Sequence, residues 1–141
     1  PELAGYESQR REVKYGKNSR IDILLESGGK PPCYVEVKNV TMKRDLGPDG
    51  FAEFPDSVTT RGAKHLVELA DMVAEGHRAV MFYLVQRDDC PLFKIAGDID
   101  PDYETGLVTA RKAGVEVLCY QFKVTPQDIT LLGPVPMDLP S

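Results

Sequence analysis

Seven consecutive apolar residues, Ala79 to Val85, constrain the fold of this 141-residue chain more than any other feature. An unbroken apolar run of this length is typical of a β-strand that is covered on both faces of its sheet. Apolar residues at helical spacing precede it over 59–75 and follow it over 101–113, and a further apolar strand is predicted over 115–122. A strand, a helix and a second strand in succession form a right-handed crossover between parallel strands. The sequence therefore predicts an α/β fold.

The ends of both predicted helices carry recognisable signals. Gly76 follows the first helix at the position where a C-terminal cap belongs. Asp100 and Pro101 supply an N-cap and a first-turn proline for the second helix, which is expected to end near Gly114.

The first part of the chain predicts a different kind of sheet. Segments 11–15, 20–26 and 33–40 have strand patterns and are joined by short links, which favours an antiparallel meander. Residues 41–58 show no clear regular pattern, and loops of this length in small domains are often functional. We therefore expect one domain over 1–141, with a mixed sheet of antiparallel and parallel strands and with helices on both of its faces.

One strand register places two acidic residues together. If Leu25 pairs with Cys33, Asp22 lies directly opposite Glu36 in the neighbouring strand. We assume this register because it gathers apolar residues on one face of the sheet. Those residues are Ile21, Ile23, Leu25, Val35 and Val37.

Two opposed carboxylates repel each other within a sheet, and a hard divalent cation would remove that repulsion. Lys38 shares a face with Glu36 and would lie beside such a cation, where it could orient an attacking water. A cation held in this way polarises a phosphate and lowers the pKa of bound water, so these residues predict metal-assisted phosphodiester hydrolysis. The alternative is a surface ion-pair cluster in which Lys38 only neutralises the two acids.

Charge is unevenly distributed along the chain, whose formal net charge is −5. Residues 1–64 hold 11 Lys and Arg against 10 Asp and Glu, whereas residues 65–141 hold 6 against 12. A polyanion would therefore meet the first half of the chain, where Arg10, Arg11, Lys14 and Arg20 are clustered. An ordinary solvated strand pair with basic edges would give the same pattern.

Arg61, Lys64 and His65 occupy positions i, i+3 and i+4 of the first predicted helix, so they share one side of it. That side is either a basic surface or a helix flank on which Lys64 pairs with Glu68. His65 taken alone is expected to be a hydrogen-bonded structural histidine.

Several classes of protein are not expected. The three cysteines lie far apart without a Cys-x-x-Cys pair, which disfavours a zinc site and favours reduced thiols in a cytoplasmic protein. No apolar stretch approaches the roughly 18 residues of a membrane-spanning helix. The first residues show neither an initiator Met nor a basic-then-apolar leader, so we expect a fragment of a longer protein and no signal peptide.

Three longer segments carry a resemblance to a known family. Residues 15–22 (YGKNSRID), 34–41 (YVEVKNVT) and 54–66 (FPDSVTTRGAKHL) resemble the sugar fermentation stimulation protein A family, and the similarity continues through 75–80 and 98–101. It covers nearly all of the chain. The resemblance implies a restriction-endonuclease-like domain of the PD-(D/E)xK nuclease superfamily.

The resemblance also implies roles for individual residues. Asp22 would be the first acid of the superfamily motif, and Glu36 and Lys38 would be its second acid and lysine. The two acids and the carbonyl of Val37 would bind Mg²⁺ or Mn²⁺. DNA would be the partner, with phosphates held by Arg10, Arg11, Lys14, Arg20, Arg61, Lys64 and His65.

Members of the family usually have an additional N-terminal OB-fold-like domain, so the resemblance implies one domain of a two-domain protein. Members of the wider superfamily also often have a further acid on an initial helix, for which Glu7 and Glu53 are weak substitutes. The favoured function is a metal-dependent DNA nuclease. The alternatives are a catalytically inactive DNA-binding regulator of sugar (maltose) metabolism genes and a domain that binds no nucleic acid.

Overall fold

The structure is a computed structural model that describes residues 3, 6, 8–15, 19–45, 47 and 50–140. At residues 8, 11–15, 19, 20, 124 and 129 it describes the backbone alone. Glu7, one of the two substitute acids, lies outside the described residues.

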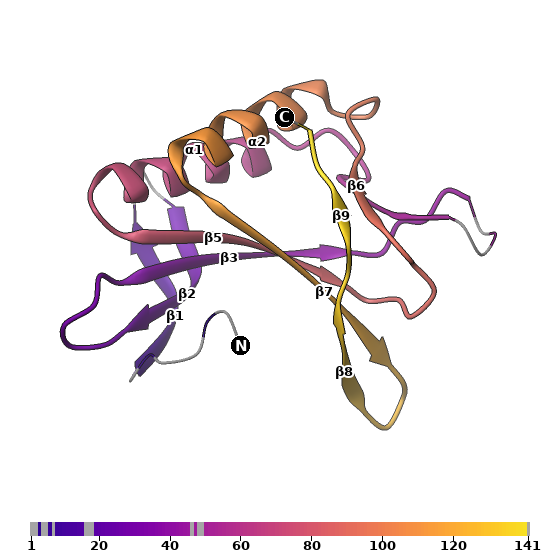
Figure 1. Cartoon of the computed structure of the whole chain (residues 1–141), viewed down its shortest axis with the longest axis horizontal. Coiled ribbons are helices and arrows are strands. Elements are labelled where there is room, and N and C mark those ends of the chain that lie inside the picture. Colours follow the sequence, from indigo (N-terminus) through magenta and orange to yellow (C-terminus); the bar gives the residue numbers. More distant parts are fainter. Residues whose placement is uncertain are drawn as a thin grey trace.

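Six strands form the main sheet in the order β1-β2-β3-β5-β7-β8 (Figure 1). They are β1 (Ser8–Tyr15), β2 (Ser19–Glu26), β3 (Cys33–Val40), β5 (Arg78–Val85), β7 (Glu116–Val124) and β8 (Ile129–Pro134). The pairs β1–β2, β2–β3 and β7–β8 are antiparallel, and the pairs β3–β5 and β5–β7 are parallel. The predicted mixed sheet, with its meander and its parallel crossovers, is therefore confirmed.

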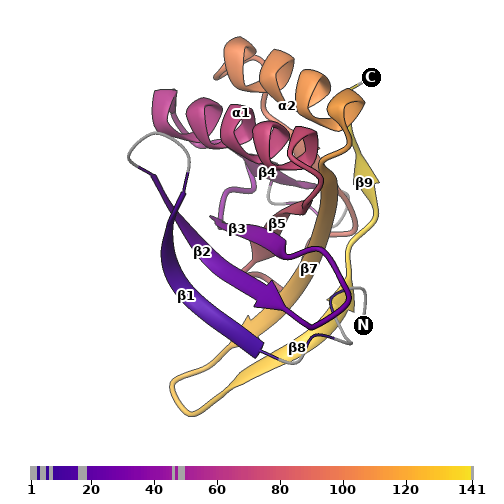
Figure 2. The same ribbon diagram turned by 90° about the vertical axis from the view of Figure 1, so that its left-hand side faces the viewer.

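Two helices, α1 (Thr60–Ala74) and α2 (Pro101–Ala113), lie side by side on the same face of this sheet (Figure 2). The expectation of helices on both faces is wrong. The chain passes from β3 to β5 and then to β7 in one direction across the sheet. Two right-handed crossovers that advance in the same direction place both of their helices on the same face.

A second sheet of three short parallel strands was not expected. It contains β4 (Ala52–Phe54), β6 (Phe93–Ile95) and β9 (Met137–Asp138). Segment 41–58 is therefore not wholly irregular, because β4 lies within it. Strands of two or three residues are too short to show the alternation by which a strand is recognised in a sequence.

The two helices begin at a shared hydrogen-bonded junction. Thr59 caps α1, with its Oγ1 accepting from Gly62 N at 2.8 Å. Asp100 caps α2, with Oδ1 accepting from Tyr103 N at 3.0 Å, while its Oδ2 accepts from Thr59 N at 2.8 Å. One buried aspartate therefore fixes the starts of both helices. The expected caps are confirmed at Asp100 and at Gly114, whose φ of +111° is left-handed.

The larger hydrophobic core lies between the helices and the sheet. Leu66 and Leu69 of α1 and Leu107 of α2 pack there with Tyr83 of β5. Tyr83 and Tyr103 share a hydrogen bond of 2.5 Å between their hydroxyls, so both polar ends are satisfied inside the core.

A smaller core on the other face of the sheet is centred on Leu25, Cys33, Val35 and Val80. Ile23 and Val37 join it as expected, but Ile21 packs in the larger core. The β1–β2 hairpin bends toward α1 at the end where Ile21 lies, which brings that end of β2 beneath the helices (Figure 2).

Two further sequence expectations concern the cysteines and membrane spans. Cys33, Cys90 and Cys119 are all free and buried. Within the described ranges, no helix has the length and apolar character needed to cross a membrane.

Candidate active site

Strands β2 and β3 stop pairing next to the two predicted acids. Their paired residues are Leu25 with Cys33, Leu24 with Tyr34 and Ile23 with Val35, which confirms the expected register. At the next position the Asp22 side chain replaces a backbone partner, because its Oδ2 accepts from Val37 N at 2.8 Å. The carboxylate of Asp22 is thus held at the point where the two strands separate.

Glu36 is almost completely buried, with 3% of its surface exposed. Its Oε1 lies 3.4 Å from Lys38 Nζ and 3.1 Å from His65 Nδ1. Its Oε2 is also buried, and among the described residues this oxygen has no hydrogen-bond partner. An unpartnered buried carboxylate oxygen costs free energy, so this atom is open to a proton shared with Asp22, to a water or to a cation.

The two acids differ in the direction of their pKa shifts. Burial and the nearby charge of Glu36 raise the pKa of Asp22, although the hydrogen bond from Val37 N partly opposes them. Burial also acts to raise the pKa of Glu36, but the neighbouring His65 side chain and the charge of Lys38 outweigh it and leave that pKa lowered. Without a cation, a proton taken up by this acid pair therefore resides preferentially on Asp22.

His65 completes the group from the opposite layer. It lies on the inward side of α1, 5% exposed, and its Nδ1 is 2.9 Å from Lys38 Nζ. The spacing of residues in the sequence indicates this buried position of His65. His65 precedes Leu69 and Met72 by four and seven residues, the spacing of a buried helix stripe, and both of those side chains are buried.

The donor set fits a hard divalent cation. Asp22 and the free oxygen of Glu36 offer carboxylate oxygens, which Mg²⁺, Mn²⁺ and Ca²⁺ prefer. No cluster of three or more His, Cys, Asp or Glu that could hold a metal occurs in the described part of the chain. A cation here would take its other ligands from water, from a backbone carbonyl such as that of Val37, or from a phosphate, as Mg²⁺ commonly does.

Glu53 does not supply a further acid to this site. Both of its carboxylate oxygens accept hydrogen bonds from Arg44, which also binds Asp98 through two hydrogen bonds. Glu53 is therefore neutralised within a cluster that connects β4 to the loop after β6.

The other predicted basic residues lie on α1 and on the β1–β2 pair. Arg61 is exposed in the first turn of α1, whereas Lys64 is exposed and lies 3.7 Å from Glu68, as in the alternative interpretation of that flank. Arg10 is exposed and pairs with Glu26 at 2.8 Å. The side chains of Arg11, Lys14 and Arg20 lie outside the described atoms, although their backbones belong to β1 and β2.

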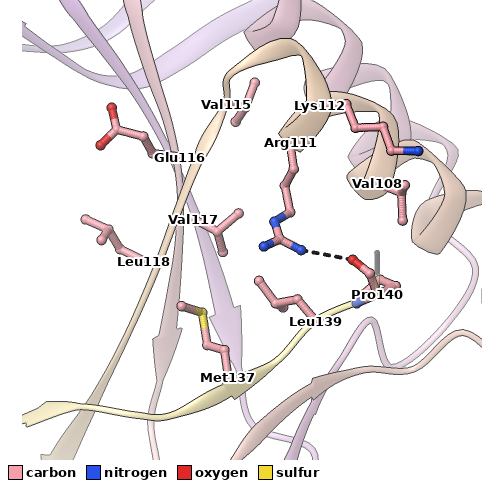
Figure 3. Close-up of a pocket in the computed structure, with 10 residues that line it drawn as sticks. All are labelled: Val108, Arg111, Lys112, Val115, Glu116, Val117, Leu118, Met137, Leu139 and Pro140. Carbon is pink, nitrogen blue, oxygen red and sulfur yellow. Dashed lines mark hydrogen bonds between the residues drawn. The ribbon is translucent and has the colours of Figure 1, made fainter.

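A separate groove of about 640 Å³ lies between the end of α2, the start of β7 and the C-terminal segment (Figure 3). Its floor is mostly apolar, and Arg111 crosses it to donate to the carbonyl of Pro140 at 2.9 Å. The groove shares no residue with the group formed by Asp22, Glu36, Lys38 and His65.

Comparison with known proteins agrees with this arrangement. A family model described as the sugar fermentation stimulation protein RE domain matches residues 1–128. The chain belongs to this family. Sugar fermentation stimulation protein homologs from Roseobacter denitrificans and Paramagnetospirillum magneticum are 58% and 59% identical to it, over 137 and 138 residues. These alignments cover 97% and 98% of this chain and 57% of each relative, so the chain spans little more than half of their length.

A solved structure has the same fold. SfsA from Pyrococcus furiosus, determined in complex with Ca²⁺, superposes with a TM-score of 0.82 at 26% sequence identity. The superposition covers 94% of this chain and 57% of that one. The restriction-endonuclease-like α/β fold expected from the family resemblance is therefore supported by this neighbour.

Proposed function

We propose that this domain binds a divalent cation at Asp22 and Glu36 and hydrolyses phosphodiester bonds in DNA. The observation that carries the proposal is the buried Oε2 of Glu36. This oxygen has no partner among the described residues, and the charge of Glu36 acts on Asp22. Lys38 and His65 already occupy Oε1, so the remaining oxygen is the one available to a ligand.

The solved relative supports a cation of this class. Pyrococcus furiosus SfsA was determined with Ca²⁺, which takes oxygen ligands as Mg²⁺ and Mn²⁺ do. Mg²⁺ or Mn²⁺ is the cation that we propose for the reaction, because Mg²⁺ is typically held by one or two carboxylates together with water and substrate phosphates.

Each protein group has a defined task in this proposal. When bound, the cation would supply a water of lowered pKa and would polarise the scissile phosphate. Asp22, which accepts from Val37 N, and Glu36, which lies beside Lys38, would bind the cation. Lys38 presents its ammonium beside Glu36, where it can orient the attacking water. Arg61, with Arg10, Arg11, Lys14, Arg20 and Lys64, would hold the phosphates of the strand.

A second candidate is a DNA-binding regulator of sugar (maltose) metabolism genes that keeps this fold without cutting. The family name refers to sugar metabolism, and the chain covers only 57% of its relatives, so residues outside it could complete the function. The net charge of −5 favours a third candidate, a domain that binds no nucleic acid. Asp22→Ala separates the first two, because it abolishes cleavage by a nuclease but preserves or strengthens DNA binding by a regulator.

The decisive experiment is a calorimetric titration of Mn²⁺ into the chain and into the variant Asp22→Asn/Glu36→Gln. The matched control is Asp71→Asn/Glu75→Gln, which removes two exposed carboxylates at the end of α1 and changes the net charge equally. We expect binding to the wild type and the control but not to the site variant. Cleavage of single-stranded and duplex DNA is then assayed with the same three proteins. Absence of Mn²⁺ binding to the wild type would overturn the nuclease proposal.

A further inference from the structure

His65 is placed where it cannot act as the phosphate contact expected from the sequence. Only 5% of its surface is exposed, and its side chain lies beneath α1 rather than on the exposed flank that carries Arg61 and Lys64. A residue so buried has little surface to offer to a DNA backbone. Its side chain contacts two members of the acid site, Lys38 and Glu36.

The Lys38 ammonium makes two hydrogen bonds inside the protein. Its Nζ lies 2.9 Å from His65 Nδ1 and 3.4 Å from Glu36 Oε1. His65 Nδ1 also lies 3.1 Å from Glu36 Oε1, and this one nitrogen can accept from Lys38 or donate to Glu36 but cannot do both. An ammonium has three N–H donors and no acceptor, so the shorter contact, with Lys38, requires an Nδ1 without a proton. Two donors are thereby used, and one remains for a water or a substrate oxygen.

This geometry addresses a problem that a flexible lysine poses for catalysis. Lysine has a four-carbon stem, and a mobile ammonium beside two carboxylates would occupy many positions, including the one a cation needs. A bond to a helix that is packed in the core restricts it to one side of Glu36. A reactive site requires its catalytic groups to be held in one arrangement, and contacts from surrounding residues provide this restraint.

We propose that His65 is a positioning residue that holds Lys38 through Nδ1, and that it leaves Glu36 Oε2 free for the cation. This inference rests on the proposed function for its catalytic consequence, whereas the contact itself can be tested without catalysis. Substitution of His65 removes the contact with Lys38 and keeps both carboxylates in the chain.

The first test is spectroscopic and needs neither metal nor DNA. The chain has two histidines, His65 and His77, whose ring nitrogens can be assigned in long-range ¹H–¹⁵N correlation spectra. We expect Nδ1 of His65 to be the nitrogen without a proton and its resonance to shift in Lys38→Met, while the resonances of His77 stay unchanged. A proton on Nδ1 would mean that His65 donates to Glu36 instead. That result, or an unchanged resonance in Lys38→Met, overturns the inference.

The second test uses substitutions that keep or remove the acceptor. Asn places its side-chain oxygen near the position of Nδ1, whereas Gln places its amide near Nε2 and Ala removes the group. We expect kcat for DNA cleavage to fall about 10- to 100-fold in His65→Ala and His65→Gln, with KM changing little and with partial recovery in His65→Asn. His77→Asn, at the other histidine, serves as the matched control.

A double-mutant cycle then identifies the group through which His65 acts. If the effect passes through Lys38, His65→Ala has no further effect on kcat in the Lys38→Met background. Additive losses, or a loss that is confined to KM and to salt-dependent DNA affinity, would show that His65 contacts the substrate. If the wild type neither binds Mn²⁺ nor cleaves DNA, the proposed function fails, and the spectra alone decide whether His65 holds Lys38.

Discussion

The side chains at the acid site have opposing effects on stability when no cation is bound. Asp22 is held beside Glu36, and its pKa is raised by burial and by that neighbouring charge. Glu36 has two cationic or hydrogen-bonding neighbours that lower its pKa. Ionised Asp22 therefore costs the folded chain free energy, whereas ionised Glu36 contributes to its stability.

Asp22→Asn should stabilise the metal-free chain at neutral pH by up to about 1 kcal/mol, because it removes a like-charge repulsion and retains an oxygen for Val37 N. The stability contribution of a group with a raised pKa is present at low pH and is lost as the pH rises through that pKa. The difference between variant and wild type should therefore be largest near pH 7 and vanish toward about pH 4.

Urea unfolding in the presence of a chelator measures this difference, and Glu36→Gln is the comparison of opposite sign. The lowered pKa of Glu36 gives a contribution that is present above the ordinary carboxyl range and is lost as the pH falls through the folded pKa. Glu36→Gln should consequently destabilise the chain at pH 7. Destabilisation by Asp22→Asn at pH 7 would contradict the electrostatic account of the site.

Among the secondary-structure elements, long patterned segments were predictable and short ones were not. Strand β5 is a run of seven apolar residues within Arg78–Val85, and α1 has a periodic apolar side, so both were found. Strands β4 and β9 have three and two residues, and they exist because β6 pairs with both of them in space. Such pairing is a tertiary property that no local pattern records.

The candidate site was likewise predictable where it depends on strand pattern and not where it depends on tertiary packing. Alternation along β2 and β3 fixed the register and brought Asp22 and Glu36 together, as the pairing of Ile23 with Val35 confirms. The place of His65 beneath α1 depends on how the helix is rotated over the sheet. Its spacing from Arg61 grouped it with a basic side of the helix, although His65 taken alone was expected to be a hydrogen-bonded structural histidine. Packing of the neighbouring Leu66 and Leu69 in the core decided the rotation.

The junction of α1 and α2 gives a prediction at this scale. Asp100→Ala removes the cap of α2 and leaves the partly buried N–H of Thr59 without its acceptor. A lost cap costs about 0.5–2 kcal/mol, and an unsatisfied buried donor adds about 1–3 kcal/mol. We expect a loss of roughly 2–4 kcal/mol in the free energy of unfolding from these two causes. Asp102→Ala, an exposed acid in the first turn of α2, should cost much less.

Denaturant unfolding followed by circular dichroism measures both variants. Because the same junction orients the helix that carries His65, Asp100→Ala should also weaken Mn²⁺ binding, whereas Asp102→Ala should not. Equal stability losses in the two variants would show that the shared junction adds nothing to ordinary helix capping.

At the scale of the whole molecule, the three thiols report on global unfolding. Cys33 and Cys119 lie in β3 and β7 of the main sheet, and Cys90 is buried in the loop before β6. Burial raises the pKa of all three, that of Cys119 to about 12. Only a thiolate reacts readily with a disulfide reagent. We therefore expect no rapid reaction of the native chain with Ellman's reagent and reaction of all three thiols in urea, and fast native labelling would contradict this burial.

Electrostatics of the whole molecule govern the last prediction, which concerns DNA binding. A chain of net charge −5 can bind a polyanion only through a local basic surface, and Arg61 is an exposed cation in the first turn of the helix that carries His65. Arg61→Ala should weaken binding similarly for all sequences and should reduce the slope of log K against log salt concentration by about 0.9 for duplex DNA. Lys112→Ala removes the same charge from the last turn of α2, beside the separate groove, and should leave that slope unchanged.

Fluorescence anisotropy over a series of salt concentrations measures both slopes. Equal changes in the two variants would indicate diffuse attraction rather than a binding surface at the acid site, and an affinity that does not depend on salt would remove DNA as the partner.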